Sequence, residues 1–331
     1  MDAVVFDAID TVSLGHVDVP RPARGEVLLR VRTCTMGQTD IEVAHGKFGA
    51  VSFPVVPGRE FTGEVVEIGA DVTGIAAGER VVVDPLIGCC QCPSCHKGQT
   101  NLCSHIRIYG ATLNGGLAEY CTVRAANVVG IGGLDLADAA LAPTMGGVLN
   151  GLSMVGPGGR DTALIFGAGP VGLLAAMALR ARGVTGIALV DRSDRRLETA
   201  ESLGFRGVPC GSASLRAMRR GADLVIEATG HASVHGQLGE HAADGARILL
   251  LSLCSPDTPL ALSPFEVVGR QLSLVGSHSL NRNLPEALDA LASFGADISR
   301  LVTARMPLSE MARIFPRGMP DRLEMVQAVM P

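Results

Sequence analysis

Residues 162–172 read TALIFGAGPVG and join a short apolar run to a glycine-rich turn. Thr162–Phe166 has the length and composition of a buried strand, and Val171–Arg182 has the apolar periodicity of a helix. In such a turn the first glycine permits the tight bend, the second lets the backbone approach a pyrophosphate, and the third allows close helix packing. The helix N-terminus favours the negative charge of the phosphates. The stretch predicts a dinucleotide site formed by Gly167, Gly169, Pro170, Val171 and Gly172.

The next apolar run indicates which dinucleotide binds. Gly186–Val190 (GIALV) reads as a second strand, and Asp191 follows it directly. An acid at this position accepts hydrogen bonds from both hydroxyls of the adenosine ribose, and its charge repels a 2′-phosphate. The sequence therefore favours NAD. Arg192 and Ser193 come next and would weaken that preference, so NADP stays open.

Strand-like and helix-like segments alternate from about Pro157 onward, which predicts a parallel, doubly wound sheet. Its later strands are expected at Asp223–Glu227, Arg247–Leu251 and Gln271–Val275, with a helix over Arg196–Leu203.

The chain before that point has a different texture. Its short β-like runs are separated by Gly and Pro, as in an antiparallel, barrel-like domain. They include Glu26–Arg32, Gly63–Ile68 and Arg80–Val83. The tail from Leu284 reads as a helix, a short strand and a second helix, and we expect it to return to the first domain.

Four cysteines at close spacing predict a metal site. Cys89, Cys92, Cys95 and Cys103 are separated by two, two and seven residues, which suits a closed tetrahedral zinc cage. Such a cage has no open coordination position, so we expect one structural zinc per chain that stabilises this lobe. Cys90 breaks the spacing and is spare. The other cysteines read as small core residues: Cys34, Cys121, Cys210 and Cys254.

Composition excludes several classes of protein. The 331 residues are 47% hydrophobic and 18% charged, with a net charge of −5, so the chain is neither disordered nor built to bind nucleic acid. Two arginine groups read as solvated helix faces: Arg192, Arg195 and Arg196, then Arg216, Arg219 and Arg220. Two long uncharged stretches could be mistaken for membrane spans, but Gly and Pro interrupt both. The N-terminus lacks the basic residues with which a signal peptide begins. We expect a cytoplasmic protein without a membrane partner.

Together these features resemble the zinc-containing alcohol dehydrogenase branch of the medium-chain dehydrogenase/reductase superfamily. The resemblance covers nearly the whole chain. Besides the cysteine lobe and the Gly167–Gly172 turn, it includes Pro57–Val65 (PGREFTGEV), Gly115–Tyr120 (GGLAEY), Glu227–Gly230 (EATG) and Val275–Ser277 (VGS). It implies an α/β protein: a GroES-like β-barrel catalytic domain over residues 1–147, a Rossmann domain over 148–280, and a segment 281–331 that returns to the catalytic domain.

The same resemblance implies further partners of the chain. Thr229 and Ser277 fall in motifs that contribute to the family's cofactor site. The substrate is expected to be a small molecule, and the assembly a homodimer or homotetramer.

In that family a second zinc polarises the substrate oxygen, but its ligands are replaced here. The positions of the family's Cys and His ligands hold Gly37 and Arg59, and the third ligand falls near Pro143 and Thr144. Of the usual set only Glu60 remains. One carboxylate cannot hold a catalytic zinc, and the adjacent arginine opposes it electrostatically. A displaced site using Cys34 or His45 is the alternative.

Other side chains are then candidates for the chemistry. Thr39 stands where the family's hydroxyl passes the substrate proton onward, and Glu42 replaces the relay histidine, unless it is a surface carboxylate. Arg59 either pairs with Glu60 or binds a substrate carboxylate or a developing enolate. Asn150 and Tyr109 are further donors by position, although core packing explains Tyr109 more simply.

Loss of the metal favours substrates that are already activated, because a metal ion contributes several kcal/mol to the stabilisation of the transition state. The sequence therefore predicts a nicotinamide-dependent reductase of an activated C=C, C=N or C=O bond. One alternative is a polyol or alcohol dehydrogenase that uses Thr39 and Glu42 as a proton relay. Another is an inactive cofactor-binding scaffold.

Overall fold

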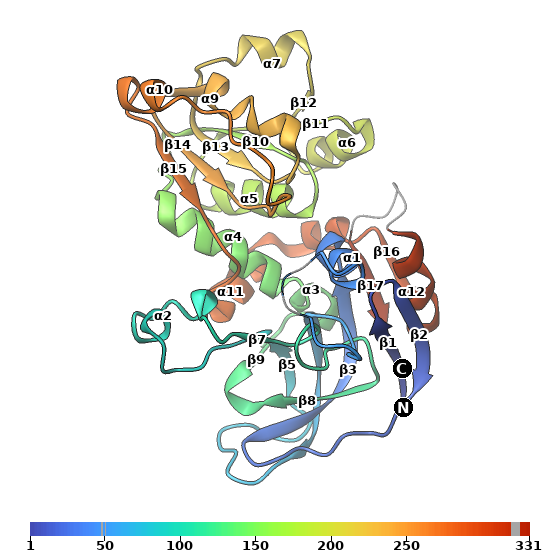
Figure 1. Cartoon of the computed structure of the whole chain (residues 1–331). Coiled ribbons are helices and arrows are strands. Elements are labelled where there is room, and N and C mark those ends of the chain that lie inside the picture. Colours follow the sequence, from blue (N-terminus) through green and yellow to red (C-terminus); the bar gives the residue numbers. More distant parts are fainter. Residues whose placement is uncertain (48, 50, 319–324) are drawn as a thin grey trace. The chain divides into compact units, whose positions relative to one another are not determined.

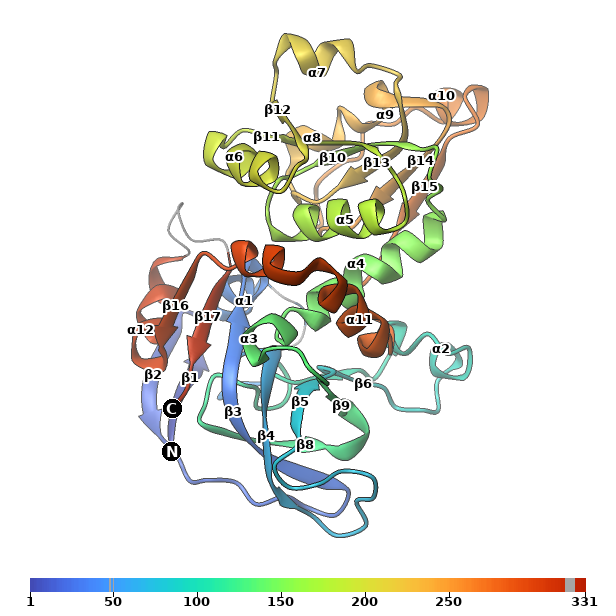
Figure 2. The ribbon, with the colours of Figure 1, turned by 180° about the vertical axis from the view of Figure 1, so that it is seen from behind.

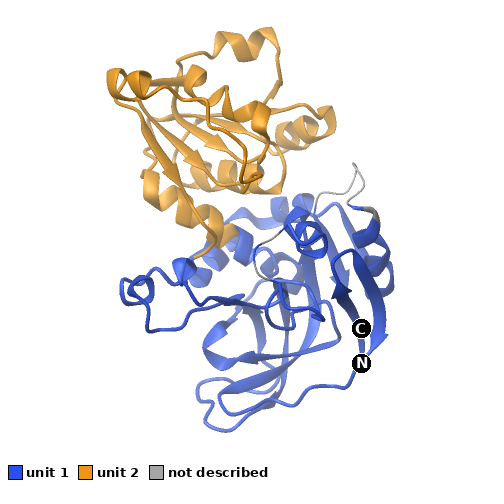
Figure 3. Cartoon of the chain, in the orientation of Figure 1, with its two compact units in different colours: residues 1–144, 281–331 blue, residues 145–280 orange. Residues whose placement is uncertain are grey.

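The computed structural model describes residues 1–47, 49, 51–318 and 325–331, and these form two compact units (Figures 1 and 3). Unit 1 combines Met1–Thr144 with Asn281–Pro331, and unit 2 is Met145–Leu280. The boundary between the units falls within helix α4 (Ala142–Val155).

Unit 1 is built on β-sheets. In the described part of the chain its main sheet has seven strands, in the order β16-β17-β3-β4-β5-β9, with β8 also paired to β3. These strands are β3 (Glu26–Met36), β4 (Glu60–Ile68), β5 (Arg80–Val83), β8 (Tyr120–Arg124), β9 (Val128–Gly130), β16 (Ala304–Pro307) and β17 (Val326–Val329). Two smaller pairs are β1 (Asp2–Ala8) with β2 (Thr11–His16), and β6 (Leu86–Ile87) with β7 (Arg107–Ile108). All pairs are antiparallel except β16 with β17, which confirms the predicted antiparallel domain.

Short helices complete unit 1. They are α1 (Gln38–Ala44), α2 (Pro93–His96), α3 (Leu136–Ala139), α11 (Leu284–Phe294) and α12 (Leu308–Ile314), with 3₁₀ turns at Thr100–Leu102, Ala125–Asn127, Gly295–Leu301 and Phe315–Arg317. Figures 1 and 2 both show α12 beside β1 and β2, and the two termini close together. The core explains this arrangement, because the buried rings of Phe6 and Phe315 meet edge to face at 4.8 Å.

Unit 2 contains a parallel sheet of six strands in its described residues, in the order β12-β11-β10-β13-β14-β15. The strands are β10 (Thr162–Phe166), β11 (Gly186–Asp191), β12 (Arg206–Pro209), β13 (Ala222–Glu227), β14 (Ala242–Leu250) and β15 (Ser273–Gly276). Strands β10, β11 and β13 are buried along nearly their whole length, as expected when helices cover both faces of a sheet. The strand order reverses beside β10, which is the doubly wound arrangement that places a ligand at that point.

Six helices lie within the described residues of unit 2, besides the larger part of α4. They are α5 (Pro170–Ala181), α6 (Asp194–Ser202), α7 (Ala213–Ala217), α8 (Ala232–His235), α9 (Leu238–His241) and α10 (Pro264–Gly269). Leu164, Phe166, Val225 and Ile248 are buried in the sheet's core.

Some local expectations differ from the structure. Strand β17 was not expected, yet it pairs with β3 and joins the chain's end to the main sheet. The prediction that Cys210 and Cys254 are core residues is wrong, because both are exposed, whereas Cys34 and Cys121 are buried as expected. No helix within the described residues is long and apolar enough to cross a membrane.

Candidate active site

The cysteine lobe has the geometry that a zinc ion requires. The sulfur atoms of Cys89, Cys92, Cys95 and Cys103 all lie within 4.8 Å of one another. Backbone amides donate to these sulfurs, from Cys89 to Cys103 Sγ at 3.2 Å and from Cys92 to Cys89 Sγ at 3.3 Å. Such donors stabilise thiolates, the form that binds metal. Among the residues that the structure describes, this is the one group of three or more His, Cys, Asp or Glu placed to share a metal ion.

The glycine-rich turn after β10 admits no larger side chain at two positions. A β-carbon on Gly172 would lie 1.9 Å from the Gly167 carbonyl oxygen, so only glycine fits there. Gly167 has φ +108°, and a β-carbon on it would lie 2.9 Å from the Ala228 carbonyl oxygen. Helix α5 begins after Gly169 with Pro170 in its first turn, and Gly169 has no side chain to cap the helix. The first amides of the helix are thus available to a diphosphate.

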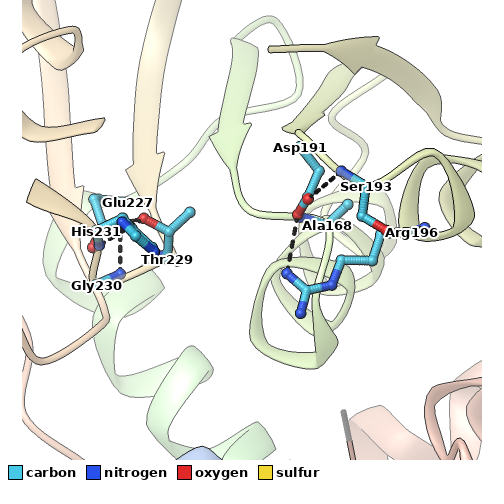
Figure 4. A network of polar contacts seen from close by, with 8 residues as sticks. All are labelled: Ala168, Asp191, Ser193, Arg196, Glu227, Thr229, Gly230 and His231. Atoms are coloured by element: carbon cyan, nitrogen blue, oxygen red, sulfur yellow. Dashed lines mark hydrogen bonds and ion pairs between the residues drawn. The ribbon is translucent and has the colours of Figure 1, made fainter. Parts of the chain in front are cut away.

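Asp191 ties the end of β11 to this turn. Its Oδ2 atom accepts a hydrogen bond from the Ala168 amide at 2.9 Å, and its Oδ1 atom accepts one from the Ser193 amide at 2.9 Å. Figure 4 shows the guanidinium of Arg196 on the same carboxylate, with Nη1 at 3.5 Å from Oδ2. Arg196 was expected on a solvated helix face; its side chain is 36% exposed and also reaches from α6 back to Asp191. Arg192 is exposed.

Glu227 organises the loop after β13 (Figure 4). Its fully buried Oε1 atom accepts hydrogen bonds from the amides of Thr229 at 2.7 Å and Gly230 at 2.9 Å, and from the Thr229 hydroxyl. The loop lies against the glycine-rich turn, since a β-carbon on Gly167 would lie 3.0 Å from Thr229 Cγ2. The structure therefore brings Thr229 to the predicted cofactor residues.

In unit 1, Asp40 joins two of the positions where the family's zinc ligands would stand. Arg59 donates from Nε to Asp40 Oδ1 at 3.2 Å, and the Gly37 amide donates to Asp40 Oδ2 at 3.0 Å. The Asp40 side chain is 4% exposed and that of Arg59 is 18% exposed. The sequence suggested Glu60 as the ion-pair partner of Arg59, but the pair in the structure is with Asp40. Asp40 therefore fixes the start of helix α1, and Thr39 with it, relative to the Arg59 guanidinium.

Glu60 has a separate partner at the third ligand position. The Thr144 hydroxyl donates a hydrogen bond to Glu60 Oε1. Burial is the main cause that raises the pKa of Glu60 to about 7, while the Thr144 hydrogen bond lowers it, the nearby charge of Asp40 raises it and that of Arg59 lowers it. Glu60 is thus a largely buried carboxyl group whose pKa lies near neutral pH.

The remaining candidates are placed as follows. Thr39 and Glu42 lie one turn apart on α1, both partly exposed, and neither side chain makes a hydrogen bond to the described part of the chain. Tyr109 is a core residue: its Oη accepts from the Arg124 amide at 2.9 Å and its ring packs on Phe61. Asn150 donates to Ser277 Oγ at 3.3 Å.

The alternative of a displaced zinc site is not supported. His45 is bonded to Asp10, and Cys34 is fully buried with a weak contact from its sulfur to the Thr35 carbonyl. Neither belongs to a cluster of potential ligands within residues 1–47, 49, 51–318 and 325–331.

Comparison with known proteins agrees with this geometry. Residues 23–133 match the alcohol dehydrogenase GroES-like domain, and residues 170–293 match the zinc-binding dehydrogenase family. D-altritol 5-dehydrogenase of Agrobacterium fabrum (strain C58) is 42% identical over 325 residues, which is 97% of each chain. The chain belongs to the medium-chain dehydrogenase/reductase superfamily. D-arabinitol dehydrogenase 1 of Uromyces fabae is 29% identical over 303 residues, 88% of this chain and 86% of the relative.

A solved structure agrees as well. A protein of Sinorhizobium meliloti 1021 described as a zinc-binding dehydrogenase and bound to NADP superposes with a TM-score of 0.95, at 29% identity over 99% of both chains. This medium-chain dehydrogenase is accordingly an NAD(P)-dependent oxidoreductase with a small-molecule substrate, not an inactive scaffold. The predicted GroES-like and Rossmann folds are confirmed.

Four residues that the sequence did not point to complete these sites: Asp40, Thr144, Arg196 and Glu227. Glu227 had a signal, because it opens a motif that the family shares. Thr144 had a weaker one, since it stands near the family's third ligand position and was considered only as an unsuitable zinc ligand. Asp40 follows the ligand position at Gly37 by three residues, and was assigned no role from the sequence. Arg196 had none that separates it from the other arginines of its helix.

Proposed function

We propose that this enzyme oxidises a secondary hydroxyl of an acyclic polyol to the ketone, passes the hydride to NAD(P)⁺, and does so without a catalytic zinc. The observation that carries the substrate class is the similarity along 97% of the chain to D-altritol 5-dehydrogenase. A D-arabinitol dehydrogenase among the relatives supports the same class. The comparisons thus favour the polyol alternative over the reduction of an activated double bond, which the sequence placed first.

The catalytic metal of the family does not fit the residues of this chain. Two hydrogen-bonded pairs, Arg59 with Asp40 and Thr144 with Glu60, occupy the region of the family's ligands. A zinc ion there would meet the Glu60 carboxylate, an Asp40 carboxylate already paired with Arg59, and the Arg59 guanidinium, which is neither the family's ligand set nor a favourable field. The cysteine lobe, in contrast, fits one structural zinc, which would stabilise the fold and take no part in the reaction.

The proposed mechanism assigns roles to the chain's own residues. Arg59 places a fixed positive charge where a metal would otherwise stabilise the developing alkoxide. Thr39 is the candidate hydroxyl that orients the reacting hydroxyl, and Glu42 exchanges protons with water. The nicotinamide cofactor supplies the hydride acceptor. The residues that would hold it are Gly167, Gly169, Pro170, Val171, Gly172, Asp191, Arg192, Thr229 and Ser277, with Asp191 favouring NAD over NADP.

A substrate screen tests the proposal. Altritol, arabinitol and other C5–C6 polyols are incubated with NAD⁺ and with NADP⁺, and the product is identified by ¹³C NMR. We expect a ketose and stoichiometric reduced cofactor. Enones, quinones and cyclic imines with NADH serve as the comparison set; turnover confined to that set would overturn the polyol assignment.

We also propose a homodimer or homotetramer in which β15 contacts a second copy. Strand β15 is at the end of the parallel sheet, so one of its edges has no partner strand within the described residues. Phe265 and Val268 in the preceding helix are 86% and 82% exposed, and Leu274 on the strand is 43% exposed. Open strand edges and exposed apolar groups mark interfaces. Sedimentation of wild-type protein and of Phe265→Glu tests this, and a monomeric wild type would contradict it.

A further inference from the structure

We propose that the Glu60 carboxylate is the base that takes the proton of the substrate hydroxyl, and that Thr144 positions it. The inference rests on the proposed polyol oxidation and names the proton acceptor that replaces the metal. Glu60 begins strand β4 and Thr144 lies in the first turn of α4, 84 residues later, so the fold brings the two side chains together. Neither residue is completely buried, although the Glu60 carboxyl group itself is largely shielded from solvent.

The two oxygens of this carboxylate are not equivalent. Oε1 accepts the Thr144 hydroxyl, whereas Oε2 makes no hydrogen bond to the residues that the structure describes. One oxygen is held in place and the other is available. This arrangement suits a group that must accept a proton in a fixed direction.

Two charged groups act on the Glu60 carboxyl. Asp40 on α1 disfavours its anionic form, and Arg59 favours it. Glu60 in turn helps to raise the pKa of the buried Cys34 thiol on β3, which stays neutral. The buried Asp40–Arg59 pair keeps opposite charges beside Glu60, so neither charge acts on it alone. Together with burial, these charges set the pKa of Glu60 at about 7. A carboxyl group with such a pKa both accepts and returns protons at neutral pH.

The step balances without another reactant. The O–H bond of the substrate breaks and its proton passes to Glu60 Oε2. The C–H bond of the carbon that bears the hydroxyl breaks as the C=O bond forms, and a bound NAD(P)⁺ would supply the hydride acceptor that balances this oxidation. Protonated Glu60 then releases its proton to water. The reverse reaction starts from protonated Glu60.

The sign of the pH dependence follows. Oxidation needs the carboxylate, so kcat/KM for the polyol rises as pH increases through about 7 and then levels. Ketose reduction needs the acid, so its kcat/KM falls over the same range. Because the Thr144 hydrogen bond lowers the pKa of Glu60, its removal by Thr144→Val moves both midpoints upward, by roughly half to one pH unit. Thr144→Ser restores the midpoint.

The experiment measures full pH profiles of wild type, Glu60→Gln, Thr144→Val and Thr144→Ser, with Glu67→Gln, an exposed acid on the same strand, as the control. Glu60→Gln is expected to lower kcat by about 100-fold or more and to lose the limb near pH 7. Glu67→Gln is expected to keep the wild-type kcat and the wild-type pH dependence near pH 7. If Glu60→Gln retains the limb and the rate, Glu60 is not the base, although polyol oxidation stands.

A second measurement separates this inference from the substrate class. Infrared difference spectra of wild type against Glu60→Gln follow the carboxyl band of Glu60 in NADH-bound protein, with no substrate present. A midpoint near 7 supports the inference and one near 4.5 overturns it. If the screen yields an activated carbonyl instead of a polyol, the polyol proposal fails, and the same pH profiles with that carbonyl decide whether Glu60 donates the proton.

Discussion

Asp191→Asn separates two roles of one carboxylate, the shaping of the glycine-rich turn and the recognition of the cofactor's ribose. The carboxylate accepts hydrogen bonds from two backbone amides, each at 2.9 Å. Asparagine keeps the size and one oxygen, but its amide group faces the second N–H donor with another donor. The amide of Ala168, which is fully buried, or that of Ser193 then loses its partner.

The magnitude follows from these contacts. An unsatisfied buried amide costs about 1–3 kcal/mol of folding stability, and distortion of the turn that it supports weakens NADH and NADPH alike. The lost charge-assisted bond to the ribose weakens only NADH, by about another 1.5 kcal/mol or roughly tenfold. Removal of the negative charge relieves repulsion of a 2′-phosphate. The ratio of the dissociation constants of NADPH and NADH should therefore fall by roughly tenfold or more.

Calorimetric titration of both cofactors measures the ratio directly. Asp194→Asn is the matched control, because Asp194 is an exposed acid three residues after Asp191, at the start of helix α6. The affinities of this variant for NADH and NADPH should stay within about twofold of wild type. If Asp191→Asn weakens both cofactors by the same factor, Asp191 shapes the turn but does not recognise the ribose. Tighter binding of NADPH to the wild-type enzyme would show that Arg192 and Arg196 outweigh Asp191.

Three further predictions address the other sites. Cys95→Ser should remove the bound zinc and lower the temperature of unfolding or aggregation in a thermal scan, since metal binding contributes on the order of 10 kcal/mol to the folding of small zinc modules. Cys90 is exposed and outside the cluster, so Cys90→Ser should unfold at the temperature of wild type. Arg59→Met should lower kcat by ~100-fold or more with cofactor binding intact; normal turnover would show that Arg59 is only the structural partner of Asp40. Gly172→Ala places a methyl group 1.9 Å from the Gly167 oxygen and should abolish calorimetric NADH binding, whereas Gly236→Ala, with open space around it, should not; retained binding in Gly172→Ala would show that the turn does not hold the diphosphate.

The sequence was sufficient for those parts of the structure that depend on neighbouring residues. The apolar runs at β10, β11 and β13, the glycine-rich turn and the cysteine spacing are all local patterns, and each predicts its own geometry. The parallel, doubly wound sheet was predicted from the alternation of strands and helices. The position of Asp191 likewise followed from its place at the end of β11.

Contacts between distant residues could not be predicted in this way. The bond from Thr144 to Glu60 spans 84 residues and that from Arg59 to Asp40 spans 19, and nothing in the local pattern of either segment specifies its partner. Charge alone suggested that Arg59 pairs with its neighbour Glu60. Arg59 lies in a bend directly before β4, and its side chain reaches Asp40 on α1. Strand β17 was missed because it gains its stability from pairing with β3, not from its own sequence.

The central claim is that this dehydrogenase works without a catalytic zinc. The most direct test is the metal content of active protein, purified without added zinc and measured by plasma mass spectrometry alongside its polyol turnover. The predicted result is one zinc per chain in fully active wild-type protein. This zinc is lost from Cys95→Ser, and the zinc content of Arg59→Met equals that of wild type. Two zinc ions per chain, or activity that chelation removes while the fold remains intact, would contradict it.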